Sequence, residues 1–117
     1  MSDTATDSLF DLNLSEEQYI SRESLRRFAA AELREKSRPA DEAAAAPEGF
    51  YNKTMELGLS IMPIPEAYDG AGMPRSPISN MLNAEDLAAG DMSLAIGTLS
   101  PLAFINAVID AGTEEQQ

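Results

Sequence analysis

The chain has 117 residues and a formal net charge of -12, because 20 acidic residues outnumber eight basic ones. This length permits one domain with a modest core, and the negative charge excludes nucleic acids and anionic membranes as electrostatically attracted partners. With neither cysteine nor histidine, disulfides, thiolate nucleophiles and the usual transition-metal sites are excluded as well.

The amino-terminal residues 1–13 are acidic and polar, and they lack the basic and apolar regions of a signal peptide. We expect a disordered arm over 1–13 and a single helical domain over 14–117. No apolar run approaches the roughly 18 residues that span a bilayer. The sequence therefore predicts a soluble chain without a membrane span, and the absence of cysteine is compatible with a cytoplasmic location.

The first predicted helix begins at Glu16, because Ser15 and Gln18 form a capping-box pattern. Pro39 is expected to end or bend this helix near Arg38. Six of the eight basic residues lie in this segment. We interpret them as a solvated helix face, with contact to an acidic partner surface as the alternative.

The middle of the chain predicts two further helices after a short helical turn within Asp41–Gly49. One covers Phe50–Leu57 and stops at Gly58, a typical helix terminator. The next opens at Ser76 or Ser79 and stops at Gly90.

The remaining residues predict a fourth helix that begins near Asp91 and a fifth that follows Pro101, in which Leu102–Ile109 is almost entirely apolar. No alternating strand pattern appears, so the expected class is all-α, a bundle of about five helices. Thr113 and Gln116 form a second capping-box pattern at the very end of the sequence. On this basis we expect the chain to be the front part of a longer or split protein.

The segment PIPEAYDGAGMPRS, residues 63–76, contains Gly70 and Gly72 in a proline-rich setting. A dinucleotide-binding loop needs three glycines in G-x-G-x-x-G after a strand, and this segment lacks that pattern. We interpret it as a turn after Asp69, with a glycine at positive φ, that reorients the chain before the third helix.

Few residues could perform catalysis. The carboxylates Glu85, Asp86 and Asp91 could act as a general base if burial raised a pKa, but a helix end and a helix cap explain them better. The hydroxyls of Ser93, Thr98 and Ser100 have no paired base, and local backbone hydrogen bonding explains them. The residues by themselves therefore predict no catalytic residue and no metal site.

Several segments in order resemble the amino-terminal helical domain of acyl-CoA dehydrogenases: GLSIMPIPEAYDGAGMP, NAEDLAAGDMSLAIG and AGTEEQQ. The resemblance extends from about Leu14 to Gln117. Two positions depart from the family pattern, Asp69, where a glycine is usual, and Gly90, where a larger residue is common. Both departures affect turn geometry.

The resemblance implies an FAD flavoprotein that oxidises the Cα–Cβ bond of acyl-CoA thioesters, in which a glutamate takes the α-proton and FAD accepts a hydride. In that family the glutamate and most FAD contacts belong to the middle and carboxy-terminal domains. This chain would then be inactive alone, and it would need those missing domains, in a homo-oligomer, for activity. The resemblance implies that this chain forms part of the wall of the cavity for the flavin and the acyl chain. The substrate-binding residues that it implies are Leu99, Ser100, Leu102 and Ala103.

An alternative is a free-standing, non-catalytic helical module that binds a protein partner through its apolar end. If the chain is instead the front part of a dehydrogenase, we expect the apolar surface of Leu102–Ile109 to contact a partner domain. In these 117 residues alone that surface would stay partly uncovered.

Overall fold

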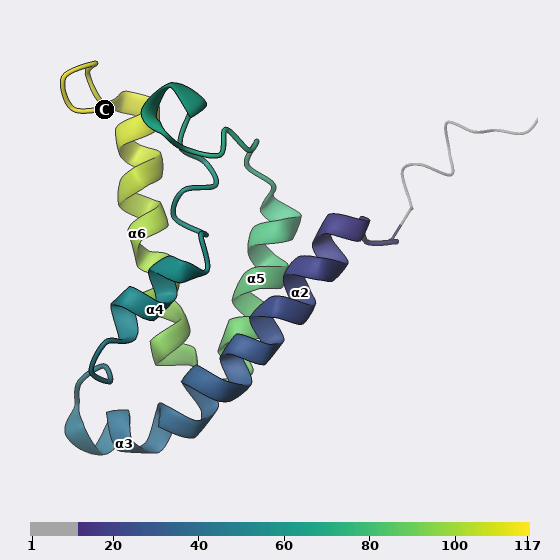
Figure 1. Ribbon diagram of the computed structural model, residues 1–117, viewed down its shortest axis with the longest axis vertical. Helices are drawn as coiled ribbons and strands as arrows, with labels where there is room; N and C mark the ends of the chain where they lie inside the picture. The colour runs from purple at the N-terminus through teal and green to yellow at the C-terminus, as the bar shows by residue number, and fades with distance from the viewer. Residues whose placement is uncertain (1–11) are drawn as a thin grey trace, which may run out of the picture.

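The structure is a computed structural model that describes residues 12–117 (Figure 1). Within this range the helices are α2 (Glu16–Phe28), α3 (Glu35–Ala43), α4 (Phe50–Glu56), α5 (Pro77–Ala88) and α6 (Met92–Ala111). A π-helical segment, η2 (Ala29–Arg34), joins α2 to α3, and a 3₁₀ turn, η3 (Glu66–Tyr68), precedes α5. No strand occurs among residues 12–117, and the predicted all-α class is confirmed. Most of the predicted amino-terminal arm, residues 1–11, lies outside the described residues.

The predicted helix starts are confirmed by their caps. Ser15 and Gln18 form both bonds of the capping box, at 2.9 and 3.2 Å, so α2 begins at Glu16. Of the two serines considered for α5, Ser76 is the cap, since its hydroxyl accepts from the Ser79 N–H at 3.2 Å. The Asp91 carboxylate likewise accepts from the Leu94 N–H at 2.8 Å at the start of α6.

Of the two outcomes expected at Pro39, an end or a bend, the bend is the one observed (Figure 1); the helix continues past Arg38, so only the possibility that it ends there is wrong. The segments α2, η2 and α3 are continuous, and Pro39 lies inside α3. A proline removes one N–H donor and tends to bend a helix without always ending it, and Figure 1 shows the axis turning between α2 and α3. The helix ends at Ala43, and its C-cap Ala44 adopts the left-handed conformation.

The predicted break at Pro101 is also wrong, because α6 runs as one helix through this proline. A residue with an N–H at position 101 would donate to the carbonyl of Gly97. The hydroxyl of Ser100 donates to that carbonyl instead, at 3.2 Å. The missing backbone bond is thereby replaced, and the predicted fourth and fifth helices form a single element.

As one helix, α6 has 20 residues and a mean hydropathy of 1.7, which is long and apolar enough to cross a membrane by length and composition. The prediction that no apolar run approaches this length is therefore wrong. A single such helix is weak evidence for a membrane span, since the core helix of a soluble protein meets the same criteria. Within the described residues, only 17% of the most apolar 18-residue stretch of this helix is buried.

The helices form a thin layer in which α5 lies between α2 and α6 (Figure 1). The Cα atoms extend only 18 Å along the shortest axis. One core lies where the first helix, α4, α5 and α6 meet, and its buried members are Leu25, Ala29, Leu33, Phe50, Leu59, Leu87, Leu94 and Ala95. Such a thin layer leaves much apolar surface on the outside, and among residues 12–117 there are 14 exposed large hydrophobic side chains.

The corner between α5 and α6 packs closely against the π-helical segment. A Cβ atom at Gly90 would lie 2.6 Å from the carbonyl oxygen of Ala29 and 2.9 Å from the Cβ of Leu33. The guanidinium of Arg34 donates to the Ala89 carbonyl at 2.8 Å beside this contact. Only glycine permits this approach at position 90.

The segment before α5 is a compact turn, as expected, and the glycine with the predicted positive φ is Gly72, not Gly70. Gly72 has φ +60°, and Asp69 is itself left-handed with φ 61°. Gly70 does not have positive φ. Glycine is required at this position for steric reasons, because a Cβ atom would lie 2.0 Å from the Ile64 carbonyl oxygen. The Gly72 N–H donates to that same oxygen at 2.8 Å, which holds the two arms of the turn together.

Replacing Gly90 by alanine should destabilise the chain by about 2 kcal/mol, because the new methyl group overlaps backbone that cannot move freely. The matched control is Gly97→Ala, where a Cβ would meet only ordinary contacts beginning at 3.7 Å. A helix-interior alanine should raise stability there by about 0.5–1 kcal/mol. Urea unfolding of both variants measures the difference, and equal stability of the two would contradict the close approach.

Candidate functional site

The four predicted substrate-binding residues all lie in the middle of α6, but they do not share one surface. Ser100 and Ala103 are exposed, whereas Leu99 is half-buried and packs against the core. Leu102 is half-buried on another side of the helix, where it lines a cavity. The structure thus divides these residues into an outward pair and an inward pair.

The outward side of α6 is mostly apolar. Phe104 is 74% exposed and Ile96 60% exposed, and they lie near Ser100, Ala103 and Ala107 on the same exposed side. Within Leu102–Ile109 none of the residues is classed as buried. This outward face of α6, defined as Ile96, Ser100, Ala103, Phe104 and Ala107, is an uncovered apolar surface of the kind that marks an interface.

A second feature is a cavity of about 450 Å³ between the start of α2, the start of α5, the loop before α5 and the later half of α6. We call it the interhelical cavity. Its apolar lining includes Leu59, Leu82 and Leu102, and its polar lining is rich in amides and hydroxyls. The volume is within the range of small-molecule pockets.

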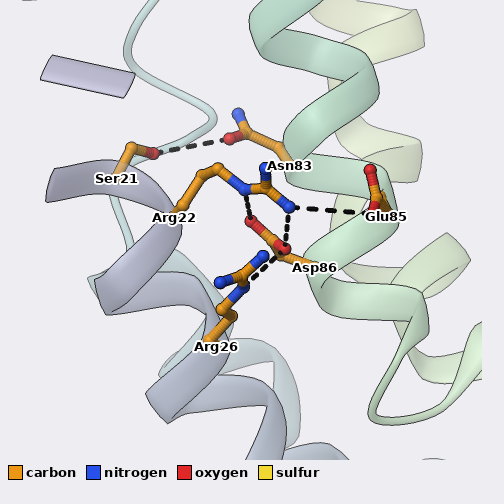
Figure 2. A network of polar contacts seen from close by, with 6 residues as sticks. All are labelled: Ser21, Arg22, Arg26, Asn83, Glu85 and Asp86. Carbon is orange, nitrogen blue, oxygen red and sulfur yellow. Dashed lines mark hydrogen bonds and ion pairs between the residues drawn. The ribbon is translucent and has the colours of Figure 1, made fainter. Parts of the chain in front are cut away.

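The carboxylate of Asp86 is the centre of a polar network between α2 and α5 (Figure 2). Arg22 donates to it through two nitrogens, each at 2.8 Å, and Arg26 donates at 2.9 Å. The Asp86 side chain is only 3% exposed. Hydrogen bonding from Arg22, then from Arg26, holds the pKa of Asp86 below its usual value despite burial.

The other two carboxylates considered as bases also have structural surroundings. Asp91 caps α6 and accepts from the Ser37 hydroxyl, and these hydrogen bonds lower its pKa. Glu85 is exposed and lies 3.7 Å from Arg22. A lowered pKa makes Asp86 and Asp91 weaker proton acceptors, so the structural interpretation of both is favoured over catalysis.

The hydroxyl groups follow the expected local pattern. Thr98 is buried and donates to the Leu94 carbonyl at 2.8 Å, and Ser100 donates to the Gly97 carbonyl. Across residues 12–117, no group of three or more acidic side chains is arranged to hold a metal ion.

The basic side chains bear on whether these residues could hold the pyrophosphate of FAD. A flavin dinucleotide carries a pyrophosphate that needs free N–H donors or cations. All eight basic side chains already have partners: Arg22 and Arg26 with Asp86, Arg27 with Glu23, Lys36 and Lys53 with Glu32, Arg38 with Glu42, Arg75 with Asp110, and Arg34 with the Ala89 carbonyl.

The interpretation of the basic residues on α2 as a solvated face is therefore incomplete, because Arg22 and Arg26 belong to the Asp86 network. Two functional candidates were not anticipated, the Arg75–Asp110 pair beside the interhelical cavity and Asn106 in its wall. A polar Asn106 within an otherwise apolar stretch is a signal that sequence reasoning could have used.

Replacing Asp86 by asparagine should destabilise the chain by about 3 kcal/mol, because Arg22 and Arg26 lose their shared buried acceptor. Thermal or urea unfolding at neutral pH tests this. The control is Glu85→Gln, which removes an exposed charge from the same helix and should change stability by less than about 0.5 kcal/mol. Comparable losses in the two variants would contradict a central role for Asp86.

Acid should weaken the fold through the same group. Because the folded-state pKa of Asp86 is lowered, its contribution is present above its unfolded pKa of about 3.9 and is lost as pH falls through the folded pKa. Unfolding free energies measured across this acidic window should fall more steeply for the wild type than for Asp86→Asn. Parallel curves for the two proteins would argue against the ion pair.

Comparison with known proteins matches residues 15–117 to the family model described as "Acyl-CoA dehydrogenase, N-terminal domain". The chain is 32% identical over 85 residues to benzylmalonyl-CoA dehydrogenase of Aromatoleum aromaticum, covering 73% of this chain and 22% of that protein. It is 32% identical over 114 residues to the probable acyl-CoA dehydrogenase YngJ of Bacillus subtilis, covering 92% of this chain and 28% of that protein.

The chain thus spans about a quarter of the length of these curated relatives. No solved structure gives a significant match. The family model covers nearly all of the described residues, and the helical fold agrees with it. The chain therefore belongs to the acyl-CoA dehydrogenase family, with the sequence and fold of its amino-terminal domain.

Proposed function

We propose that this chain is the amino-terminal part of an FAD-dependent acyl-CoA dehydrogenase, which oxidises the Cα–Cβ bond of acyl-CoA thioesters when middle and carboxy-terminal domains complete it. The observation that carries the proposal is the outward face of α6. It presents Phe104 and Ile96 to solvent on a helix whose apolar window is only 17% buried. Such a face needs a covering layer.

The proposed contribution of the chain is to supply one apolar wall of the cavity that holds the flavin and the acyl chain. Of the four candidate residues, Ser100 and Ala103 are exposed and are the ones proposed to contact the acyl group. Leu99 and Leu102 are half-buried and would position the helix behind them. An apolar wall excludes water from the reacting centre, which strengthens electrostatic interactions there.

The catalytic base and most of the FAD site are proposed to come from the other domains. All eight basic side chains are already paired, so a pyrophosphate would have to displace existing bonds. A domain boundary at residue 14, a homo-oligomer of the completed protein and a cytoplasmic location are parts of the same proposal.

The second candidate function is a free-standing helical module that binds a protein partner and performs no reaction. The same outward face of α6 favours it, because an exposed apolar surface can serve either a domain of the same enzyme or an independent partner. The two hypotheses differ in whether a flavin site forms when dehydrogenase domains are supplied.

A chimeric protein distinguishes the dehydrogenase hypothesis from the free-standing module. We expect residues 1–117, joined to the middle and carboxy-terminal parts of the Bacillus subtilis YngJ protein, to bind FAD and to oxidise acyl-CoA in a dye-reduction assay. The chain alone should neither bind FAD stoichiometrically nor oxidise acyl-CoA. Flavin absorbance and turnover are the measurements, with intact YngJ as the positive control.

Within an active chimera, Ala103→Trp should lower kcat/KM strongly while leaving the FAD content unchanged, because the added ring would fill acyl-chain space. Ser93→Trp introduces the same ring at an exposed position in the first turn of α6 and should leave kcat/KM unaltered. A folded chimera without flavin would favour the free-standing module. Activity of the 117 residues alone would contradict the proposed division between domains.

A further inference from the structure

Tyr51 on α4 lies at the border of the outward face of α6. Its hydroxyl oxygen and one of its ring carbons would each lie 3.9 Å from a Cβ atom at Gly97, where α4 crosses α6 (Figure 1). Ser100 and Phe104 follow Gly97 by three and seven residues. Residues at this spacing share one side of a helix. The Tyr51 hydroxyl therefore borders the same surface as Ser100 and Phe104.

The Tyr51 side chain is packed at its ring and open to solvent. The ring meets that of buried Phe50 edge to face, with ring centroids 5.3 Å apart and ring planes at 70°. Tyr51 is nevertheless 58% exposed. Thr54 donates to the backbone carbonyl of Tyr51 at 2.8 Å, but the phenolic hydroxyl has no partner within residues 12–117. It can therefore bind a group of a ligand that lies along the outward face of α6.

The two hydroxyl groups beside Gly97 have complementary hydrogen-bonding roles. Ser100 uses its hydrogen to donate to the Gly97 carbonyl at 3.2 Å, so its oxygen remains as an acceptor. The Tyr51 hydroxyl has its hydrogen available to donate. An alcohol group both accepts and donates, so it can bond to Tyr51 and Ser100 together. A carboxylate only accepts, so it could bond to Tyr51 alone.

The charges around this position also favour an uncharged group. Between Met92 and Ile109, α6 has no ionisable side chain. Near Tyr51 in the sequence, Lys53 is bound to Glu32 at 2.9 Å, whereas Glu48 has no ion-pair partner within residues 12–117. The chain as a whole carries a net charge of -12. An anionic group would therefore be repelled, both locally and by the chain as a whole.

We propose that Tyr51 determines substrate specificity in the completed dehydrogenase, by favouring acyl-CoA thioesters whose acyl group carries an uncharged hydroxyl away from the thioester. Tyr51 donates to the oxygen of this hydroxyl, which in turn donates to Ser100 Oγ, while the hydrocarbon lies along Ala103. The bound hydroxyl takes no part in the oxidation, so the two hydrogens still leave from Cα and Cβ. This inference rests on the proposed function and names the substrate class of the same wall.

The first test measures kcat/KM of the YngJ chimera for straight-chain acyl-CoAs of increasing length and for their ω-hydroxy counterparts. At the matching length the ω-hydroxy form should be preferred about fivefold, as expected for one net hydrogen bond. Tyr51→Phe keeps the ring and should abolish this preference without lowering kcat/KM for the unsubstituted acyl-CoA. The matched control is Tyr19→Phe, which removes a hydroxyl from a residue 60% exposed on α2 and should keep the preference.

The second test needs no other domain. In nuclear magnetic resonance titrations of the chain alone, hexan-1-ol should shift the signals of Tyr51, Gly97 and Ser100. Its isomer 1-methoxypentane can accept from Tyr51 but cannot donate to Ser100, so it should bind about fivefold more weakly. Tyr51→Phe should weaken the binding of hexan-1-ol, and Tyr19→Phe should leave it unchanged.

Two results would overturn the inference. One is an active chimera that shows no ω-hydroxy preference at any length, or one that Tyr51→Phe leaves unchanged; the proposed function would then stand without this specificity. The other is equal binding of hexan-1-ol and 1-methoxypentane, or shifts that spare Tyr51 and Gly97. An inactive chimera together with selective binding of hexan-1-ol would count against the proposed function and support the hydroxyl site at Tyr51.

Discussion

The arrangement of the helices depends on the ion pairs that the buried carboxylate of Asp86 forms with Arg22 and Arg26. This carboxylate ties α5 to α2 through Arg22 and Arg26 (Figure 2), and a buried ion with two specific partners tolerates few alternative registers. Once α5 is placed, its end at Gly90 meets the π-helical segment, and Asp91 caps the next helix. The position of α6, and therefore of both candidate surfaces, follows from this chain of contacts.

The domain is a thin layer of helices with one hydrophobic core. Apolar side chains outside this core remain exposed. Leu33 and Leu87 are fully enclosed in the core, while Phe104 on α6 is largely exposed. A free-standing domain of this size normally buries such side chains to offset the conformational entropy lost on folding. The distribution agrees with a domain whose outer faces are completed by other parts of a dehydrogenase, as we propose.

Local hydrogen bonding made many features predictable. The caps at Ser15, Ser76 and Asp91 each bond a residue three positions later, so they can be predicted from neighbouring residues in the sequence. The helix stop at Gly58 is of the same kind, with φ +70°. The break predicted at Pro101 was wrong because the effect of a proline depends on what replaces the lost N–H bond. At Pro101 the Ser100 hydroxyl does so, and the helix continues.

The sequence by itself determined the all-α class, the helix starts and the family resemblance, because these rest on composition, short-range caps and ordered motifs. Only the tertiary structure decided that Asp86 is paired, that Gly90 is required by contact with Ala29, and that Leu102 and Ser100 face different surroundings. Each of these depends on residues about 60 positions apart or on the rotation of α6 against its neighbours. Such long-range contacts are set by packing, and no local pattern in one chain specifies them.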